Sequence, residues 1–353
     1  MNILHLNNQL NLACGVSNSI FNLAYTTRNK YKHHFLALTE DAKEKFNKAG
    51  FYPELFPHKK ISLFNSYDTI KFITNYCDKN KVDIIHSHHR TFDALSFLVN
   101  KVRKTKTIVT VHNIRYDKKF ISYSSDKIIA VSKYVAEHLQ NHYKKDDAKI
   151  EIIENFINKD FIKITQYPDF IRASLKLKQT DFVLLYAGRF SEEKGIDILI
   201  NAYESLKEKF SGMKLVLIGG GPEENYYKQL NHEKNLDIIF SKPVENIFDY
   251  LNIADLVILP SRDEAFGNII LEAGYLEKIF IGSEIGNIRN FIQDKKNGLL
   301  FQSGNYLDLA EKIQHAYINF DNLNQIGINL KNSLMDKFDE QKFVLKIQNC
   351  YER

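Results

Sequence analysis

Two glutamates that could bind a polar ligand lie eight positions apart. Glu264 follows the apolar run Leu256–Leu259, and Glu272 lies on a helix that we expect to begin near Phe266. Gly267 would let a ligand approach the bare backbone, and the amide groups of a helix start form an anion site. The pattern therefore predicts a binding site. The alternative is structural: Glu264 caps the helix and Glu272 is a solvated surface residue.

A pair of cations five positions apart is the second candidate. Arg189 and Lys194 flank the loop that follows the apolar run Phe182–Tyr186 and precedes an expected helix at Asp197–Lys207. A guanidinium can bind two phosphate oxygens, an ammonium acts as a point charge, and a helix start adds its amides. Together these groups suit a diphosphate. The alternative is that both are surface cations beside neighbouring glutamates.

Three consecutive glycines, Gly219–Gly221, follow the apolar run Lys214–Ile218. At the carboxyl end of a strand, Gly219 and Gly220 would let a ligand come close to the backbone. The run does not fit the dinucleotide fingerprint, because that pattern needs a glycine where Asn225 stands, and the sequence contains no Walker motif. The alternative is a plain tight turn.

Short β-branched runs alternate with segments of helical apolar spacing along the whole chain. Near-continuous apolar strands are typical of parallel sheets, which their connecting helices bury on both faces. The pattern predicts an α/β protein with two doubly wound, Rossmann-like domains. The expected strands are Asn2–Leu6, His34–Leu38, Val82–His86, Thr107–His112, Lys127–Val131 and Ile150–Ile153, then Phe182–Tyr186, Lys214–Ile218, Leu236–Phe240, Leu256–Leu259 and Lys278–Gly282.

The length of 353 residues suits two hydrophobic cores. We expect an N-terminal domain over residues 1–163, a C-terminal domain over 164–339, a linker within Asn158–Gln179, and a final helix at 340–353 that packs back on the first domain. Two such domains facing each other across a cleft would place a ligand at the ends of both sheets.

The charge distribution and the cysteine content indicate which kinds of partner and which cell compartment suit the protein. The first 165 residues carry 26 Lys and Arg against 16 Asp and Glu, whereas the remainder carries 22 against 27. The basic half favours an anionic partner such as a membrane, a nucleic acid or a phosphorylated substrate, and general lysine-rich usage is the alternative. Three scattered cysteines and the lack of a secretory pattern predict a cytoplasmic protein. No apolar run approaches the ~20 residues of a membrane span, so any membrane contact would be peripheral.

In this order and spacing, the three signals resemble those of a family 4 glycosyltransferase, among the group 1 glycosyl transferases of GT-B fold. Glu264 and Glu272 match the family's Glu-x7-Glu motif. Arg189 and Lys194 match its pyrophosphate-binding pair, and Gly219–Gly221 its glycine turn. The resemblance covers nearly the whole chain. Further similar segments are Ala13–Ser17, Thr110–Asn113, Val131–Lys133 and Ile153–Ile157.

The resemblance implies a role for each matching residue. Glu272 would accept hydrogen bonds from a nucleotide ribose, and Glu264 from hydroxyls of the donor sugar. Arg189 and Lys194 would neutralise the departing diphosphate, while His112 would lie near the sugar and the incoming hydroxyl. The implied catalytic set is Glu264, His112, Arg189 and Lys194. The implied donor-binding set is Gly15, Val16, Arg189, Lys194, Gly219, Gly220, Phe266, Gly267, Asn268, Ile269 and Glu272.

The resemblance also implies retention of anomeric configuration by front-face displacement, in which the leaving phosphate oxygen takes the acceptor's proton. The alternative retaining route would use Glu264 as a nucleophile. No metal and no other cofactor is expected, because cationic side chains serve the diphosphate and the sequence lacks an Asp-x-Asp motif. The chain departs from the family in having one glycine in its N-terminal loop, and Asn290 where many relatives carry Glu.

Two further features bear on partners. The segment His86–His89 holds three histidines, but no cysteine or paired carboxylate lies nearby, so we expect no zinc site and place His88 on the acceptor side. The segments Arg28–His34, Lys101–Lys106 and Ile114–Tyr123 mix cations with aromatic or apolar residues, which suits an anionic membrane surface or a lipid-phosphate acceptor. Solvated helix faces are the alternative. Nucleic acid binding is not expected, because no motif for it occurs.

We therefore expect a retaining hexosyltransferase that moves a sugar from a UDP-sugar to a hydroxyl of a glycan or lipid-linked acceptor. The setting would be bacterial surface polysaccharide, lipopolysaccharide or glycoconjugate synthesis, in the cytoplasm or at the inner face of the cell membrane. Two alternatives remain: a catalytically silent sugar-nucleotide-binding subunit of a glycosylation complex, and a GT-B sugar-nucleotide epimerase.

Overall fold

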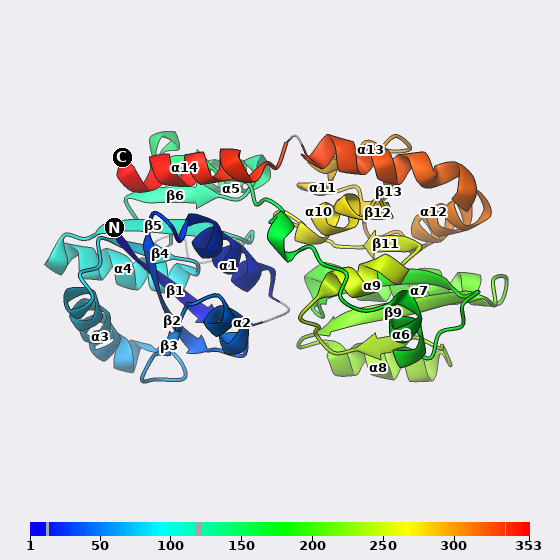
Figure 1. The fold of residues 1–353 in the computed structure, drawn as a ribbon, viewed down its shortest axis with the longest axis horizontal. Helices are drawn as coiled ribbons and strands as arrows, with labels where there is room; N and C mark the ends of the chain where they lie inside the picture. The colour runs from blue at the N-terminus through cyan, green and yellow to red at the C-terminus, as the bar shows by residue number, and fades with distance from the viewer. Residues whose placement is uncertain (12–13, 117–121, 336) are drawn as a thin grey trace. The chain divides into compact units, whose positions relative to one another are not determined.

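The computed structural model describes residues 1–11, 14–116, 122–335 and 337–353. The chain forms two compact units, Met1–Asn155 together with Glu340–Arg353, and Phe156–Asp339 (Figure 1). The boundary lies before Phe156 instead of after residue 163, because the intervening segment is bonded to the second unit. The amide of Asn246, for example, donates a hydrogen bond to the carbonyl of Lys163 at 2.7 Å.

The first unit contains a seven-stranded parallel sheet in the order β3-β2-β1-β4-β5-β6-β7. Its strands are β1 (Asn2–Gln9), β2 (Lys32–Thr39), β3 (Glu54–Leu55), β4 (Ile84–Ser87), β5 (Lys106–Val111), β6 (Lys127–Ala130) and β7 (Ile150–Ile152). Its helices are α1 (Gly15–Thr27), α2 (Lys43–Lys48), α3 (Ser66–Lys79), α4 (Arg90–Arg103), α5 (Lys133–Asn141) and α14 (Glu340–Glu352).

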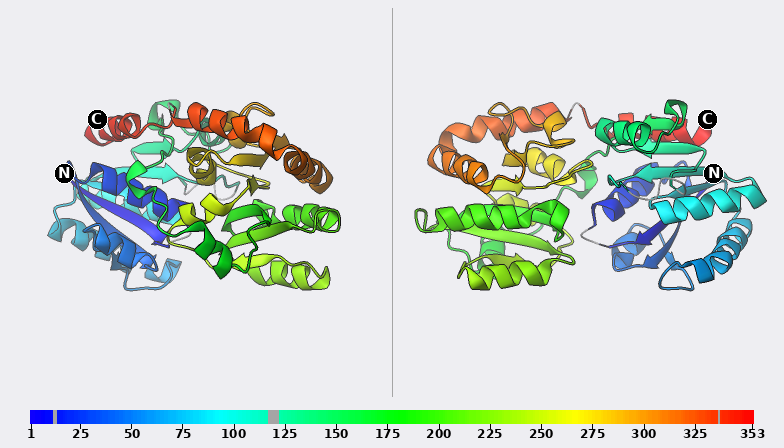
Figure 2. Two further views of the ribbon diagram at one scale, coloured as in Figure 1. Left: turned by 45° about the vertical axis from the view of Figure 1, so that its right-hand side comes forward. Right: turned by 180° about the vertical axis from the view of Figure 1, so that it is seen from behind.

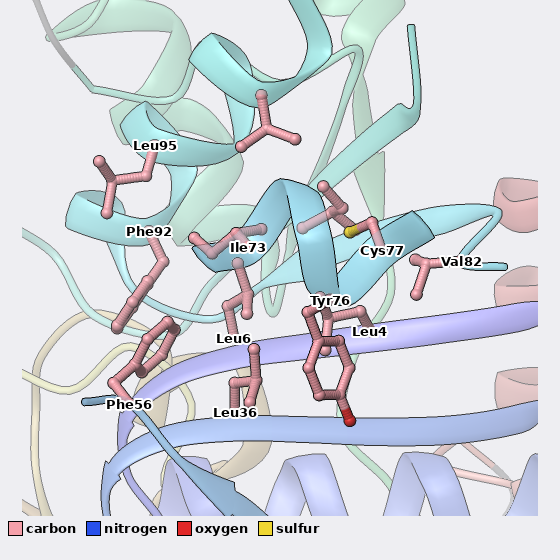
Figure 3. Close-up of a cluster of buried hydrophobic side chains, with 12 residues drawn as sticks. Leu4, Leu6, Leu36, Phe56, Ile73, Tyr76, Cys77, Val82, Phe92 and Leu95 are labelled. Carbon is pink, nitrogen blue, oxygen red and sulfur yellow. The ribbon is translucent and has the colours of Figure 1, made fainter. Parts of the chain in front are cut away.

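One face of this sheet packs against α3 and α4 and forms an apolar core (Figure 3). Leu4 and Leu6 of β1 are fully buried there with Ile73 of α3 and Phe92 of α4. Burying each of these side chains contributes about 1.5–3 kcal/mol. Because side chains alternate along a strand, His5 between the two leucines points to the opposite face. The second face of the sheet therefore carries the polar ring of His5, between the two leucines that face the apolar core.

Helix α14 packs against the first unit although it follows the second in sequence. The Lys106 ammonium donates hydrogen bonds to the carbonyls of Cys350 and Tyr351, each at 3.0 Å. A cation at the last carbonyls of a helix satisfies acceptors that lack an intrahelical partner. The Tyr351 hydroxyl also lies 2.8 Å from Nδ1 of His86, on β4. One side of the helix, which carries Phe343, Ile347, Cys350 and Tyr351, is thus buried against the first unit.

The second unit contains a six-stranded parallel sheet in the order β10-β9-β8-β11-β12-β13, with helices packed on its strands (Figure 2). Its strands are β8 (Phe182–Arg189), β9 (Met213–Gly220), β10 (Ile239–Ser241), β11 (Leu256–Leu259), β12 (Ile279–Ser283) and β13 (Leu299–Phe301). Its helices are α6 (Pro168–Ser174), α7 (Ile196–Lys207), α8 (Glu224–Glu233), α9 (Ile247–Ile253), α10 (Asn268–Tyr275), α11 (Ile288–Phe291), α12 (Tyr306–Ile318) and α13 (Asn324–Met335).

Both sheets reverse their strand order beside the first strand. β1 lies between β2 and β4, and β8 lies between β9 and β11. In doubly wound folds, ligands bind outside the carboxyl ends of the strands at this switch point. The loops that follow β1, β4, β8 and β11 are therefore the positions where the fold places functional groups.

Candidate functional site

The switch point of the second unit brings together two loops that are far apart in sequence. β8 and β11 are paired, with Leu184 opposite Leu256. The loop after β8 runs through the 3₁₀ turn Glu192–Lys194 into α7, and the loop after β11 runs into α10. Arg189 and Lys194 lie in or beside the first loop, and Glu264 in the second. The fold thus places the expected cations and the expected carboxylate at the same edge of one sheet.

Lys194 and Glu264 form an ion pair across these loops. The Lys194 ammonium donates to Oε2 of Glu264 at 2.6 Å. The Ser261 hydroxyl donates to the same oxygen at 3.2 Å. Glu264 is buried, with 8% of its surface exposed, so the carboxylate is held in one orientation by charged and neutral donors. Among the described residues, neither bond uses Oε1, which leaves that oxygen able to accept from a ligand hydroxyl.

Arg262 clamps the two loops together, and the sequence patterns did not single it out. Its guanidinium binds both carboxylate oxygens of Asp197, at 2.8 and 2.6 Å, and also donates to the carbonyl of Glu192 at 2.9 Å. Its backbone amide donates to the carbonyl of Glu193 at 2.8 Å. The residue lies two positions before Glu264, and an arginine beside a motif carboxylate is the only sequence signal for this role.

Two glycines shape these loops by conformation. Gly195 has φ +63°, and a Cβ there would lie 2.1 Å from the carbonyl oxygen of Pro260. Gly267 has φ +86°, in the left-handed region that favours glycine. The helix expected to begin near Phe266 begins instead at Asn268, because Gly267 turns the chain immediately before it. Glu272 therefore lies in the second turn of α10, where it is half-buried.

The backbone amides of Asn268 and Ile269 belong to the first turn of α10, whose N-terminal amides lack intrahelical acceptors. Phe266, in contrast, is buried, and its ring packs edge-on against Phe291 with the ring centroids 5.2 Å apart. Asn290, at the position where relatives carry Glu, is exposed and donates from its amide to Oδ1 of Asn287 at 3.1 Å.

The remaining donor-side positions differ in how they are held. Arg189 ends β8 with an exposed side chain, while its carbonyl accepts a hydrogen bond from the Tyr186 hydroxyl at 2.8 Å. Gly219, at the end of β9, has no room for a side chain, because a Cβ there would lie 1.9 Å from the carbonyl oxygen of Gly188. Gly221 is similarly restricted by Phe190, whereas Gly220 is not. The close approach of the carboxyl ends of β8 and β9 therefore accounts for two of the three glycines.

The first unit places its expected residues at the ends of β1, β4 and β5. Gly15 and Val16 form the first turn of α1, with Gly15 exposed. Ala13, the first residue of the expected glycine loop Ala13–Ser17, lies outside the described residues. His88 follows β4 and His112 follows β5, and Nδ1 of His88 lies 3.1 Å from Nε2 of His112. His88 is buried, so it can reach a ligand only through His112, which is half-buried.

Burial keeps the histidines of this region neutral. Desolvation lowers the pKa of His112, and it lowers the pKa of His86 to about 3. The pKa of His88 is also lowered, first by burial and then by the neighbouring His86 and His5. At neutral pH each ring therefore carries one N–H and one lone pair.

Three of these histidines come close enough to hold a metal. His5, His86 and His88 each offer a ring nitrogen, and the three nitrogens lie within 4.8 Å of one another. Sequence reasoning considered His86–His89 and missed His5, whose position on β1 pairs directly with His86 on β4. Every ring nitrogen of the three is also hydrogen-bonded within the protein, at 2.7–3.1 Å.

Comparison with known proteins gives the family. Residues 168–332 match the family described as "Glycosyl transferases group 1", and residues 13–161 match that described as "Glycosyltransferase Family 4". The chain belongs to the group 1 glycosyl transferases. Together, the matched segments include both switch-point regions of this glycosyltransferase.

Relatives and solved structures agree with this assignment. The glycosyltransferase is 28% identical over 343 residues to an uncharacterized glycosyltransferase of Methanocaldococcus jannaschii, with 90% of this chain and 89% of that protein covered. It is 27% identical over 180 residues to the capsular polysaccharide biosynthesis glycosyltransferase CapM of Staphylococcus aureus, with 50% of this chain and 47% of CapM covered.

The fold of this glycosyltransferase is also that of solved members of the GT-B class. The crystal structure of Anabaena HepE in complex with UDP and glucose superposes with a TM-score of 0.88 at 18% identity, covering 100% of this chain and 99% of that one. The two Rossmann-like units are therefore those of a GT-B glycosyltransferase. In the described part of the chain, no helix combines the length and apolar character that a bilayer crossing requires.

Proposed function

We propose that this glycosyltransferase moves a sugar from a nucleotide-sugar, with UDP as the nucleotide, to a hydroxyl of a glycan or lipid-linked acceptor. The process served would be bacterial surface polysaccharide or glycoconjugate synthesis. The observation that carries the proposal is the bonded set of Lys194, Glu264 and Ser261 at the switch point of the second sheet. It combines a cation for a phosphate with an oriented carboxylate for a hydroxyl.

The donor would be held by the second unit. The Lys194 ammonium has three protons, of which one is directed to Glu264, so it can also donate to a diphosphate oxygen. The exposed Arg189 guanidinium supplies a second cation on the same loop. Both would stabilise the negative charge that develops on the diphosphate as the glycosidic bond breaks. Glu272 would accept from the ribose hydroxyls, and the α10 amides would complete the site.

We propose that Glu264 binds a sugar hydroxyl through Oε1 and is not a nucleophile. The two oxygens of a carboxylate share its charge, so the bonds that Oε2 accepts from an ammonium and a hydroxyl make Glu264 a weaker nucleophile through Oε1 as well. Front-face displacement with retention is the route that this arrangement favours, and the leaving phosphate oxygen would take the acceptor's proton. Because Arg189 and Lys194 supply the positive charge, we propose that the reaction needs no metal and no other cofactor.

The test is thermal stabilisation by UDP-, GDP- and ADP-sugars, with and without magnesium. A ligand that binds only the folded protein stabilises it by RT ln(1 + c/Kd) at a free ligand concentration c, so the melting temperature rises with ligand concentration. We expect a rise with a UDP-sugar that is independent of magnesium and is lost in Lys194→Met. Lys234→Met is the matched control, because Lys234 forms an ion pair of the same length with Glu204, 2.6 Å, away from the site. No response to any nucleotide-sugar would contradict the proposal, and a magnesium requirement would contradict its metal-free form.

We also propose peripheral contact of the first unit with an anionic membrane. Leu98 and Val102 on α4 are 46% and 73% exposed, beside the exposed cations Lys101 and Lys104. Apolar groups flanked by lysines suit the interface of an anionic bilayer. The expected segment Ile114–Tyr123 lies partly outside the described residues. Sedimentation with anionic liposomes should show binding that weakens with salt, and Val102→Glu should reduce it. Binding that salt does not change would contradict this contact.

A further inference from the structure

Four histidines and one threonine form a hydrogen-bonded row across the second face of the first sheet. Nε2 of His33 lies 3.0 Å from the Thr27 hydroxyl, and Nδ1 of His33 lies 2.9 Å from Nε2 of His5. Nδ1 of His5 lies 3.0 Å from Nε2 of His88, and Nδ1 of His88 lies 3.1 Å from Nε2 of His112. The row runs from the end of α1 to the carboxyl end of β5.

The period of the strands explains why these rings meet. His33 lies on β2, His5 on β1, and His86 and His88 on and just after β4. The register pairs His5 with His86 and Ile3 with His33, so the histidines occupy the same face of neighbouring strands. His5 stacks on His33, with ring centroids 5.1 Å apart, and on His88, with ring centroids 5.3 Å apart.

The direction of the row is set at its threonine end. The Thr27 hydroxyl lies 2.7 Å from the carbonyl oxygen of Leu23, one turn earlier in α1. A carbonyl oxygen cannot donate, so the single hydroxyl proton of Thr27 must lie in this contact. The same hydroxyl can then only accept from His33. His33 therefore carries its proton on Nε2 and its lone pair on Nδ1.

The position of the proton on His33 determines its position on each following ring, because a neutral imidazole has one N–H and one acceptor nitrogen. His5 must donate from Nε2 to Nδ1 of His33. His88 must donate from Nε2 to Nδ1 of His5, and His112 must donate from Nε2 to Nδ1 of His88. The burial of His5, His33 and His88, with at most 8% of each exposed, keeps the three neutral.

We propose that Thr27, through the three buried histidines, holds His112 as the Nε2–H tautomer, with its Nδ1 lone pair available to accept a hydrogen bond from a sugar hydroxyl. Thr27, His33, His5 and His88 are positioning residues, because they act on a ligand only through His112. The role of the lone pair rests on the proposed function. The tautomer itself does not, since it follows from the protein's own hydrogen bonds.

A metal at His5, His86 and His88 is the competing use of the same rings. Both nitrogens of His86 already have partners, the Tyr351 hydroxyl at 2.8 Å and the Thr110 hydroxyl at 2.7 Å. A metal would have to displace one existing hydrogen bond from each of the three histidines. The row accounts for both nitrogens of His5 and His88 without it.

The tautomers can be measured directly by NMR of the whole protein labelled with ¹⁵N in its histidine rings. The ¹⁵N chemical shift of a protonated ring nitrogen differs strongly from that of a ring nitrogen with a lone pair. The signals of each ring are assigned by substituting that histidine. We expect Nε2–H and unprotonated Nδ1 in His5, His33, His88 and His112. An Nδ1–H signal for His112 in the unaltered protein would overturn the proposal, as would stoichiometric metal in the purified protein together with metal-shifted signals of His5 and His88.

Thr27→Val removes the hydroxyl at nearly constant volume, and we expect both tautomers of His112 to become populated. Thr27→Ser should restore the single form. Thr69→Val is the matched control, because Thr69 is equally buried on α3 and also donates to the carbonyl one turn earlier, that of Asn65, at 2.7 Å. It has no histidine partner in the described structure and should leave all four tautomers unchanged. Unchanged His112 signals in a folded Thr27→Val protein would overturn the proposal.

The effect on the reaction is measured by kinetics, separately from the NMR measurement of the tautomer. If the lone pair of His112 binds the sugar, Thr27→Val should lower kcat/KM for transfer by about five- to tenfold, and Thr27→Ser should recover it. If the unaltered protein shows the expected NMR signals but no transfer activity, the proposed function is refuted and the tautomer proposal is not. The expected pattern with full activity in Thr27→Val would overturn the ligand role of His112.

Discussion

Arg262 holds Asp197 through two parallel hydrogen bonds, and this pair joins the start of α7 to the loop that carries Glu264. The guanidinium also reaches the carbonyl of Glu192, so one side chain fixes the loop after β8 against the loop after β11. The distance between Lys194 and Glu264 therefore depends on a residue that need not touch a ligand.

Arg262→Lys should loosen this connection, because an ammonium cannot make the same parallel bonds. We expect a loss of stability of about 1 kcal/mol, since the pair is partly exposed, and a larger effect on transfer, with kcat/KM reduced about tenfold. The two are measured by thermal unfolding and by steady-state kinetics. Arg289→Lys is the control, because Arg289 forms only an exposed 3.5 Å pair with Glu284. Equal kcat/KM values for Arg262→Lys and Arg289→Lys would show that the bonds of Arg262 between the two loops do not affect transfer.

Glu264→Gln should weaken donor-sugar binding without removing the reaction. The amide can still contact Ser261 and a sugar hydroxyl but no longer pairs with the charge of Lys194. We expect kcat/KM to fall about a hundredfold, the size of effect found when one group is removed from a charge-stabilising site. The measurement is the rate of transfer, or of slow donor hydrolysis, over a range of donor concentrations that gives kcat/KM. A trapped glycosyl ester on Glu264 of the unaltered enzyme, with no residual activity in the variant, would instead establish the covalent route.

Gly195→Ala should disrupt the donor loop. The left-handed φ of +63° disfavours alanine, and the new Cβ would lie 2.1 Å from the carbonyl oxygen of Pro260. We expect destabilisation of at least about 2 kcal/mol, from backbone strain plus the shift of a loop. Gly304→Ala separates the two causes, because Gly304 has φ +81° with no atom within 4 Å of the added Cβ. The measurement is the free energy of unfolding of both variants in urea. Equal losses of stability in the two would show that the contact with Pro260 has no effect.

Acid should destabilise the first unit through its buried histidines. Burial lowers the pKa of His33 and of His86 to about 3 in the folded protein, from the ordinary value of 6.5. The unfolded chain therefore binds more protons between these values, and stability falls as pH decreases below about 6.5 and continues to fall toward 3. Each such histidine contributes a loss of about 2 kcal/mol between pH 7 and pH 5.

The measurement is the free energy of unfolding in urea at several pH values. His86→Gln should flatten the pH dependence by about one proton, whereas substitution of the exposed His315 should not change it. A stability that stays constant from pH 7 to pH 5 would contradict neutral burial of these rings.

The strands and the motif positions could be predicted because they depend on local periodicity. The run Leu256–Leu259 was predicted with the bounds that the structure gives, and β8 and β9 extend three and two residues past their predicted ends. The short strands β3 and β13 were missed, whereas β7 and β10, which are equally short or nearly so, were predicted because each overlaps a longer apolar run. The start of α10 at Asn268 depends on the left-handed turn at Gly267, which the sequence alone does not reveal.

The connections between motifs could not be predicted, because they depend on which strands become neighbours. The pair of Lys194 and Glu264 spans 70 positions, and the contact of His86 with Tyr351 spans 265. Each histidine of the row is ordinary when read along its own strand. Only the parallel register of β2, β1 and β4 makes them one group.

Helix α14 gives the first unit a discontinuous sequence, and this has a consequence for synthesis on the ribosome. The Tyr351 hydroxyl that bonds His86, and the carbonyls that receive Lys106, are made after the whole of the second unit. The buried ring of His86 must therefore remain without this partner while residues 156–339 are added. The second unit can complete its core before α14 is made, whereas the first can close only once α14 has been added.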